Sequence, residues 1–165
     1  DVRSTAALSL FESAGYVPVG AELNMSCPTS HRADPPEGVV VDRVLEDGDA
    51  AAVVAFCRRT FPHWVAELER GIEHAACLVA REGDAVLGFC CHSVNRAGWV
   101  GPMATDPERQ RGGVGSALLS AACRDLRAAG HPDAEIAWVG PVGFYAKAAG
   151  ASVSRVFRTV RKTLA

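Results

Sequence analysis

The sequence predicts a single domain of mixed α/β class, and three observations lead to this prediction. The chain has 165 residues, 48% of them hydrophobic, which is enough for one compact core but not comfortably for two. Runs rich in β-branched residues alternate with segments in which apolar residues recur every three or four positions. From Val39 onward the expected order is a strand, two helices, three strands, a helix, a strand, a helix and a final strand.

The composition excludes several classes of function. The formal net charge of -2 leaves no broad cationic surface, so we expect no nucleic-acid partner, and any anion site must be local. No apolar run is long enough to span a membrane. The cysteines form neither a C-x-x-C pair nor a finger spacing with histidine, so we expect buried free thiols in a reducing cytoplasm and no metal site. These cysteines are Cys27, Cys57, Cys77, Cys90, Cys91 and Cys123.

A stretch rich in proline and charge separates the N-terminal segment from the rest. Residues 27–38, CPTSHRADPPEG, predict a linker or a long surface crossing. It divides a short head, residues 1–26, from a body, residues 39–165.

The first half of the body shows clear patterns of strand and helix. The run VVVDRVLE predicts a strand, and the next helix, which Asp47 or Asp49 can cap, runs to about Thr60 and is followed by a second helix. The runs CLVARE and AVLGFCCHSV flank Gly83 and predict a hairpin. GWVGPMAT predicts a third strand, which Pro102 makes irregular because proline donates no sheet hydrogen bond.

In the second half, a polar loop leads into a long helix that Gly130 can end. Its apolar residues share one predicted face, which consists of Gly115, Leu118, Leu119, Ala122, Leu126 and Ala129. AEIAWVG then predicts a buried strand, and 141–149 predicts a short helix. ASVSRVFRTVRK predicts a final strand pair or one long bent strand.

The start of the long helix is a candidate anion site. Glycines let backbone amides turn inward, and a helix start offers unpaired N–H groups and the positive end of the helix dipole. The residues concerned are the glycines Gly112, Gly113 and Gly115, the rim arginines Arg109 and Arg111, and the hydroxyl of Ser116. The sequence therefore predicts that an anion binds here.

Glycine-rich loops also occur in nucleotide-binding proteins, and the residues around Gly115 exclude two such classes. A nucleoside-triphosphate loop requires Lys before its Ser or Thr, but here Ser116 follows Gly115 directly. A dinucleotide-binding fold requires a third glycine where Leu118 stands. A glycine-rich helix start that binds nothing remains the alternative.

Two linked motifs resemble the GCN5-related N-acetyltransferase (GNAT) superfamily. Gln110-x-x-Gly113-x-Gly115, preceded by MATDPERQ, resembles the acyl-CoA pyrophosphate loop of that family, and IAWVGPVGFYAKAAGA resembles its fifth strand and following helix. The resemblance covers roughly residues 39–162. It implies a central, mixed but mostly antiparallel twisted sheet, flanked by helices and splayed between its fourth and fifth strands.

The resemblance also implies an acetyl-CoA site. The pantetheine arm would bind backbone groups of the fourth strand at Met103 and Thr105, on either side of Ala104, and a main-chain N–H near Met103 would polarise the thioester carbonyl. The pyrophosphate loop would comprise Gln110, Arg111, Gly112, Gly113, Val114, Gly115 and Ser116.

Two residues are candidates for catalysis, and the family motif covers only the first of them. Tyr145 matches the general-acid tyrosine of the family, although Gly150 follows it by five residues rather than the usual four, and an ordinary half-buried aromatic is the alternative. Family members often carry a Glu on the fourth strand, but AGWVGPM has no carboxylate. His92 is therefore the candidate base, with a polar surface residue as the alternative. The early helices also carry Glu67, Glu69 and His63, for which a charged helix face is the simpler explanation.

The head resembles the end of the body. Ser9–Ser26 and Gly143–Val160 both read as a short helix, a glycine and an alternating strand. We hypothesise that residues 1–26 are the last helix and strand of a preceding sister domain in a tandem acetyltransferase. The alternative is an N-terminal helix and strand private to this domain.

The predicted function is transfer of an acetyl group from acetyl-CoA to a primary amine of a small metabolite. A non-catalytic acyl-CoA-binding or scaffold domain of a tandem protein is the alternative. Expected partners are the amine acceptor and either a sister domain or a second copy of the chain.

Overall fold

The computed structural model describes residues 1–164 and contains one seven-stranded sheet with the order β2-β3-β4-β5-β6-β1-β7. Its strands are β1 (Val17–Pro28), β2 (Val40–Arg43), β3 (Cys77–Glu82), β4 (Ala85–His92), β5 (Trp99–Thr105), β6 (Asp133–Ile136) and β7 (Ser152–Arg161). Its α-helices are α1 (Thr5–Ser13), α2 (Asp47–Thr60), α3 (Val65–Glu73), α4 (Val114–Ala128) and α5 (Val142–Ala149). Short 3₁₀ turns cover Pro62–Trp64 and Pro107–Arg109. The predicted mixed α/β class is confirmed.

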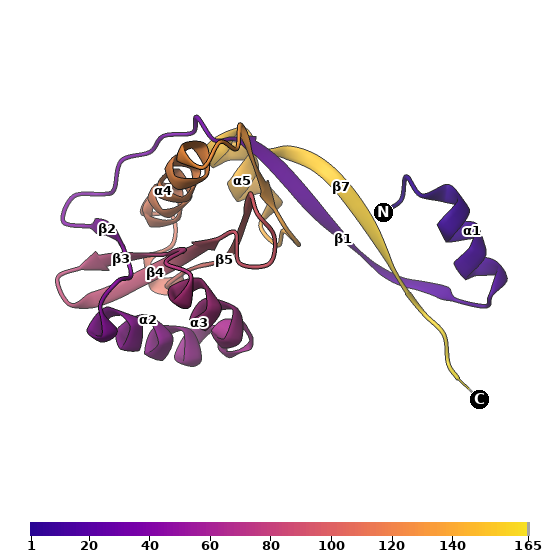
Figure 1. The fold of residues 1–165 in the computed structure, drawn as a ribbon, viewed down its shortest axis with the longest axis horizontal. Coiled ribbons are helices and arrows are strands. Elements are labelled where there is room, and N and C mark those ends of the chain that lie inside the picture. Colours follow the sequence, from indigo (N-terminus) through magenta and orange to yellow (C-terminus); the bar gives the residue numbers. More distant parts are fainter. Residues whose placement is uncertain (165) are drawn as a thin grey trace.

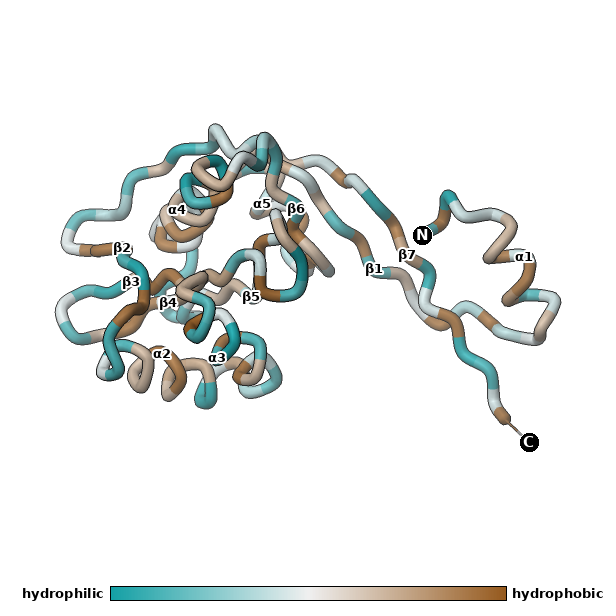
Figure 2. Tube along the Cα trace, viewed as in Figure 1, coloured by the Kyte–Doolittle hydropathy of each residue, from teal (hydrophilic) through white to brown (hydrophobic). Residues whose placement is uncertain are grey.

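Helices cover both faces of the sheet (Figure 1). On one face, α2 and α3 bury Phe56 and Leu68 against Val79 and Phe89 of the hairpin. On the other face, α4 and α5 pack over a second cluster centred on Leu118. The hydrophobic stretches follow β3 and β4 between these two layers (Figure 2), so the core lies on both sides of one central hairpin.

The sheet opens where β5 and β6 part. These two strands form the one parallel pair among the described strands, and the pairing covers only Trp99↔Glu135 and Val100↔Ile136. Beyond Val100, β5 continues to Thr105 while β6 ends at Ile136. Because β1 adds a strand before the body, β5 and β6 are the fourth and fifth strands of the predicted fold, and the predicted splay is confirmed.

Several predicted elements differ in detail. Asp49 does not cap α2, since its carboxylate binds Arg81 on β3 instead. Ala129 lies just beyond α4 and is exposed, so it is not part of the buried face, whereas Gly130 with φ +89° ends the helix as expected. The strand predicted for AEIAWVG stops at Ile136, and the N–H of Trp138 beyond it donates to the Asn24 side chain instead of to a strand. Of the two alternatives predicted for the C-terminal segment, the structure has the single long strand, β7.

The head is part of the same sheet. The inner end of β1, Met25–Pro28, pairs with β6, and nearly all of its length pairs with β7. The first two residues of the expected linker therefore belong to a strand. The remaining residues, 29–38, cross the surface to β2, held by Thr29 Oγ1 donating to the His131 carbonyl at 2.8 Å and by Ala33 N–H donating to Ser120 Oγ at 3.0 Å.

Candidate active site

The opening between β5 and β6 forms a cleft of about 1240 Å³. Its walls come from β5, the start of α4, the segment after β6 and α5, and its far end reaches Phe61, Trp64 and Glu67 beside α3. The cleft thus has an end at the α4 loop, called here the donor end, and an end beside α3, called here the acceptor end.

At the donor end, β5 presents unpaired backbone groups. The N–H of Asp106 donates to the carbonyl of Leu87 on β4 at 2.8 Å. Because the N–H groups of alternate residues point to the same side of a strand, that of Ala104 also points to β4, and those of Met103 and Thr105 point into the opening. The edge at Met103 and Thr105 can therefore bind an extended chain.

The α4 loop adds a second set of backbone donors. Val114, Gly115 and Ser116 form the first turn of α4, and their N–H groups have no acceptor among residues 1–164, while Ala117 N–H already bonds to the Gly113 carbonyl. Gly113, the N-cap, has φ +89° and caps with no side chain. Together with the positive end of the α4 dipole, these donors can bind an anion.

Close packing fixes the position of this helix start. A Cβ added to Gly115 would lie 3.2 Å from Phe144 Cζ, 3.3 Å from Thr105 Oγ1 and 3.5 Å from Met103 Cε. Glycine therefore lets α4, α5 and β5 meet at the donor end, which holds both sets of backbone donors in one place.

Not every predicted loop residue faces the cleft. Of the predicted donor-binding residues, those that line it are Met103, Ala104, Thr105, Gln110, Arg111, Gly113, Gly115 and Ser116. Gly112 does not line it, and Val114 buries its side chain in the core and offers only its N–H group. Arg109 lines the cleft but also donates to Glu82 Oε2 at 2.8 Å, which lowers the pKa of the Glu82 carboxyl.

The side chain of Tyr145 projects from α5 and lines the cleft, although the residue is only 7% exposed. Burial raises the pKa of this phenol well above its ordinary value. The hydroxyl therefore stays protonated over the neutral range and can donate a hydrogen bond. Phe144 packs beside it, with the ring centroids 4.9 Å apart.

The structure places His92, the predicted base, away from the other predicted residues, because its side chain does not line the cleft. Its Nε2 is 3.1 Å from Oδ2 of Asp125 on α4, and the same carboxylate binds Arg43 at 2.7 Å. Burial lowers the pKa of His92 against the opposing effect of Asp125, and Nδ1 is buried without a hydrogen-bond partner among the described residues. His92 therefore belongs to a structural pair under α4.

The carboxylate that the cleft does contain is Glu67. Among the residues that line the cleft it is the one acidic side chain, whereas Arg109, Arg111 and Lys147 supply positive charge elsewhere. Glu67 Oε1 accepts from Asn95 Nδ2 at 2.7 Å, and Asn95 Oδ1 in turn accepts from Arg70 at 3.0 Å. This chain orients the Glu67 carboxylate.

Aromatic side chains surround the same end of the cleft. Phe61 and Trp64 stack with centroids 5.2 Å apart, and Trp99 enters from β5. Glu67 follows Trp64 by three residues, so both lie on one side of the helical turn. The three-residue spacing of Trp64 and Glu67 is the sequence signal for this end of the cleft. The prediction that Glu67 lies on a charged helix face did not use this spacing.

Trp138 forms an exposed lip of the cleft. It is 72% exposed and has φ +50°, a left-handed backbone conformation that costs energy for a large side chain. Its N–H donates to Oδ1 of the fully buried Asn24 at 3.1 Å, and the next N–H, of Val139, donates to the Leu23 carbonyl at 2.9 Å. β1 thus holds the lip in place.

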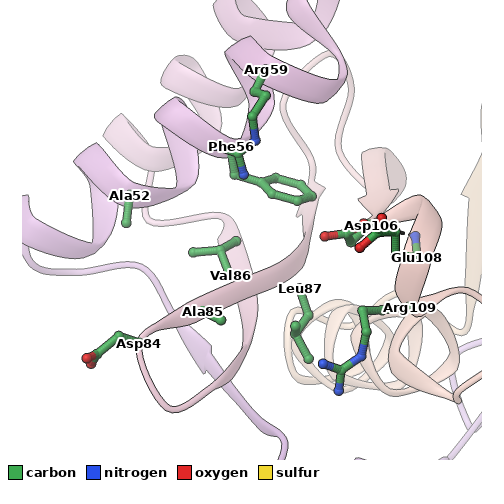
Figure 3. Close-up of a pocket in the computed structure, with 10 residues that line it drawn as sticks. All are labelled: Ala52, Phe56, Arg59, Asp84, Ala85, Val86, Leu87, Asp106, Glu108 and Arg109. Carbon is green, nitrogen blue, oxygen red and sulfur yellow. Dashed lines mark hydrogen bonds between the residues drawn. The ribbon is translucent and has the colours of Figure 1, made fainter.

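A second hollow, of about 440 Å³, shares only Arg109 with the cleft (Figure 3). Three carboxylates line it, those of Asp84, Asp106 and Glu108. Asp106 Oδ1 already accepts from the Glu108 N–H at 2.9 Å. Arg59 and Arg109 also line this hollow, so its charge is mixed.

The remaining features concern metals, thiols and membranes. Across residues 1–164, no group of three or more His, Cys, Asp or Glu is placed to hold a metal ion. The six cysteines are free and buried. The described helices include none that is both long and apolar enough to cross a membrane.

Comparisons with known proteins agree with the fold. The family model of the acetyltransferase (GNAT) domain matches residues 73–148. A search of curated protein sequences finds no match to the chain. The GCN5-related N-acetyltransferase from Sphaerobacter thermophilus is 23% identical, with a TM-score of 0.73 over 96% of this chain and 56% of that one.

Two further solved structures show the same fold. The glucosamine N-acetyltransferase region of a fungal multi-domain β-N-acetylglucosaminidase is 18% identical, with a TM-score of 0.74 over 97% of this chain and 23% of that one. A tandem GNAT protein from the clavulanic acid biosynthesis pathway is 14% identical, with a TM-score of 0.66 over 94% of this chain and 57% of that one. The chain therefore spans little more than half, or less, of these similar proteins.

Proposed function

Since the chain belongs to the GCN5-related N-acetyltransferase superfamily, we propose that it transfers an acetyl group from acetyl-CoA to a primary amine of a small metabolite, in a ternary complex. One observation carries the proposal: a single cleft has unpaired N–H groups at one end and one carboxylate, Glu67, at the other. An anionic donor and a cationic acceptor would meet between them.

The donor end fits acetyl-CoA in charge and in shape. The N–H groups of Val114, Gly115 and Ser116 would bind the pyrophosphate, with Arg111 adding charge at the rim. The edge of β5 at Met103 and Thr105 would pair with the amide groups of the pantetheine arm. The acyl donor supplies the activated acetyl thioester, and the protein supplies its position.

The reaction makes one bond and breaks one. The amine nitrogen attacks the thioester carbon, so a C–N bond forms, the C–S bond breaks and the nitrogen loses a proton. The N–H of Met103 would stabilise the negative charge that grows on the carbonyl oxygen. Tyr145 would donate a hydrogen bond, and then a proton, to the departing sulfur, and the proton that leaves the nitrogen would be relayed back to the phenol so that the protons balance.

Glu67, rather than His92, would be the base in this reaction. Its carboxylate would bind the acceptor as an ammonium ion and accept the proton that the nitrogen loses, directly or through water. Asn95 and Arg70 keep the carboxylate oriented, and the aromatic side chains around it would exclude water. The six free thiols support a reducing, cytoplasmic setting for this reaction.

Incubation of the chain with acetyl-CoA and a panel of primary amines tests the proposal. Mass spectrometry should find one amine that gains a single acetyl group, and free thiol should appear in the same amount. Binding of acetyl-CoA without turnover on any amine would favour the non-catalytic acyl-CoA-binding domain instead.

A further inference from the structure

The most unusual part of the molecule is a ribbon that leaves the body. β1 and β7 pair from Ser26↔Ser152 near the body to Val17↔Arg161 at the outer end. Only the inner end of β1 has a strand on both sides, because β6 pairs with Met25–Pro28 alone. The outer half projects away with α1 at its tip (Figure 1).

This outer part buries too little surface to be stable alone. α1 has nine residues, none of them buried, and Leu10 is 69% exposed. Val17 and Val19 on the outer half of β1 are also exposed, and apolar stretches mark both α1 and the outer ribbon (Figure 2). Isolated helices of this length and isolated two-stranded ribbons are marginal in water. The outer ribbon and α1 therefore present an apolar surface that no other element of residues 1–164 covers.

The two strands of the ribbon are each preceded by a short helix, and this similarity indicates what covers its outer end. α1 is followed by Gly15 with φ +82° and then by β1, whereas α5 is followed by Gly150 with φ +62° and then by β7. The two strands run antiparallel, so α1 stands at the outer end of the ribbon as α5 stands at the inner end. What packs on the inner end, with α5, is an acetyltransferase-fold domain.

We propose that residues 5–28 are the last helix and strand of a second acetyltransferase-fold domain that precedes Asp1 in the native gene product and packs on the outer ribbon. β1 is then a strand of that domain inserted between β6 and β7 of this one. The similar solved structures match 94–97% of this chain, so most of the head is included, yet the match spans only 56% and 57% of two of those chains and 23% of the third. A matching head therefore occurs within longer proteins.

The insertion would also complete the cleft described above. Leu23 and Asn24 of β1 bind the backbone of Val139 and Trp138 at its lip. Phe11 precedes Gly15 by four residues, the usual family spacing, and Leu10 precedes it by five, as Tyr145 precedes Gly150. The second domain would therefore carry an apolar side chain at the position that Tyr145 occupies in this domain. Acetyl transfer is then expected in the cleft of this domain alone.

Hydrogen exchange tests the proposal independently of acetyl transfer. In the native gene product, amides of α1 and of the outer ribbon should be protected as strongly as those of β3. In residues 1–165 alone, the same amides should exchange orders of magnitude faster. A native product with the mass of residues 1–165, whether monomeric or self-associated through α1, would overturn the proposal, as would a longer product whose α1 amides exchange freely.

A pair of variants in the native product sharpens the test. Leu10→Lys should lower the unfolding midpoint by about 5 °C, because it places a charge in the domain interface. Val40→Lys alters another exposed apolar residue, on the edge strand β2, and should shift the midpoint by less than about 1 °C. Equal shifts for the two variants would contradict a buried α1.

Discussion

The two ends of the cleft are built in different ways. The donor end consists of backbone N–H groups, held by close contacts around Gly115, so its chemistry depends little on which side chains are present. The acceptor end consists of side chains, chiefly Glu67 and the aromatic residues around it. Under the proposed function, binding of the acyl donor would depend on the fold, whereas choice of the acceptor would depend on a few replaceable side chains.

The largest effect on turnover is expected where the two ends meet. Tyr145→Phe should lower kcat by about 100-fold and leave the affinity for acetyl-CoA nearly unchanged, because the phenol acts on the leaving sulfur. Steady-state kinetics with a reactive amine measures this. Tyr16→Phe, which changes the second tyrosine of the chain at the outer ribbon, is the control. A normal kcat in Tyr145→Phe would remove the general acid from the account.

A change at the acceptor end should affect the amine alone. Glu67→Gln should lower kcat/KM for the amine by about tenfold, because a charge-assisted hydrogen bond to the ammonium group is lost. The affinity for acetyl-CoA should not change. Glu69→Gln, on the same helix, where Glu69 pairs with Arg58 at 3.2 Å, should behave like the parent. Equal losses in the two variants would show that Glu67 has no specific role.

A change at the Trp138 lip should affect amine binding less than a change at Glu67. Asn24→Ala removes the acceptor for the Trp138 N–H, so the KM for the amine should rise roughly threefold with little change in kcat. Ser154→Ala is matched to it, since Ser154 Oγ donates to Glu135, the carboxylate that also accepts from Asn24. A KM as high in Ser154→Ala would assign the effect to Glu135 rather than to Trp138.

The smallest effect concerns His92, which lies under α4. His92→Gln should leave kcat/KM within about twofold of the parent. Because burial lowers the pKa of His92 in the folded protein, the unfolded state binds more protons below pH 6.5, and the free energy of unfolding falls as the pH drops. Chemical denaturation should show a shallower fall between pH 6.5 and 5 in His92→Gln. A loss of turnover comparable to that of Tyr145→Phe would return His92 to the active site.

The sequence predicted the donor end better than the acceptor end, for a physical reason. The loop residues are contiguous, from Gln110 to Ser116, and a backbone site at a helix start leaves a local trace of glycines. The acceptor end joins Glu67 to Asn95 of a distant loop, and only the folded chain brings them together.

The fold itself was largely predictable from apolar periodicity, but its departures from regularity were not. β6 stops early because a side chain from the distant strand β1, Asn24, takes the N–H of Trp138. His92 looked available because its partner Asp125 lies on a helix that sequence spacing could not align with it.

Calorimetric titration of acetyl-CoA into the parent and the Ser116→Glu variant tests the central claim most directly. A Glu in the first turn of α4 favours the helix dipole, so the variant should fold normally. It should nevertheless weaken binding by about 100-fold, because the carboxylate would meet the pyrophosphate. Gly48→Glu adds the same charge to the exposed first turn of α2 and should bind like the parent. Undiminished binding in Ser116→Glu would contradict a pyrophosphate site at the start of α4.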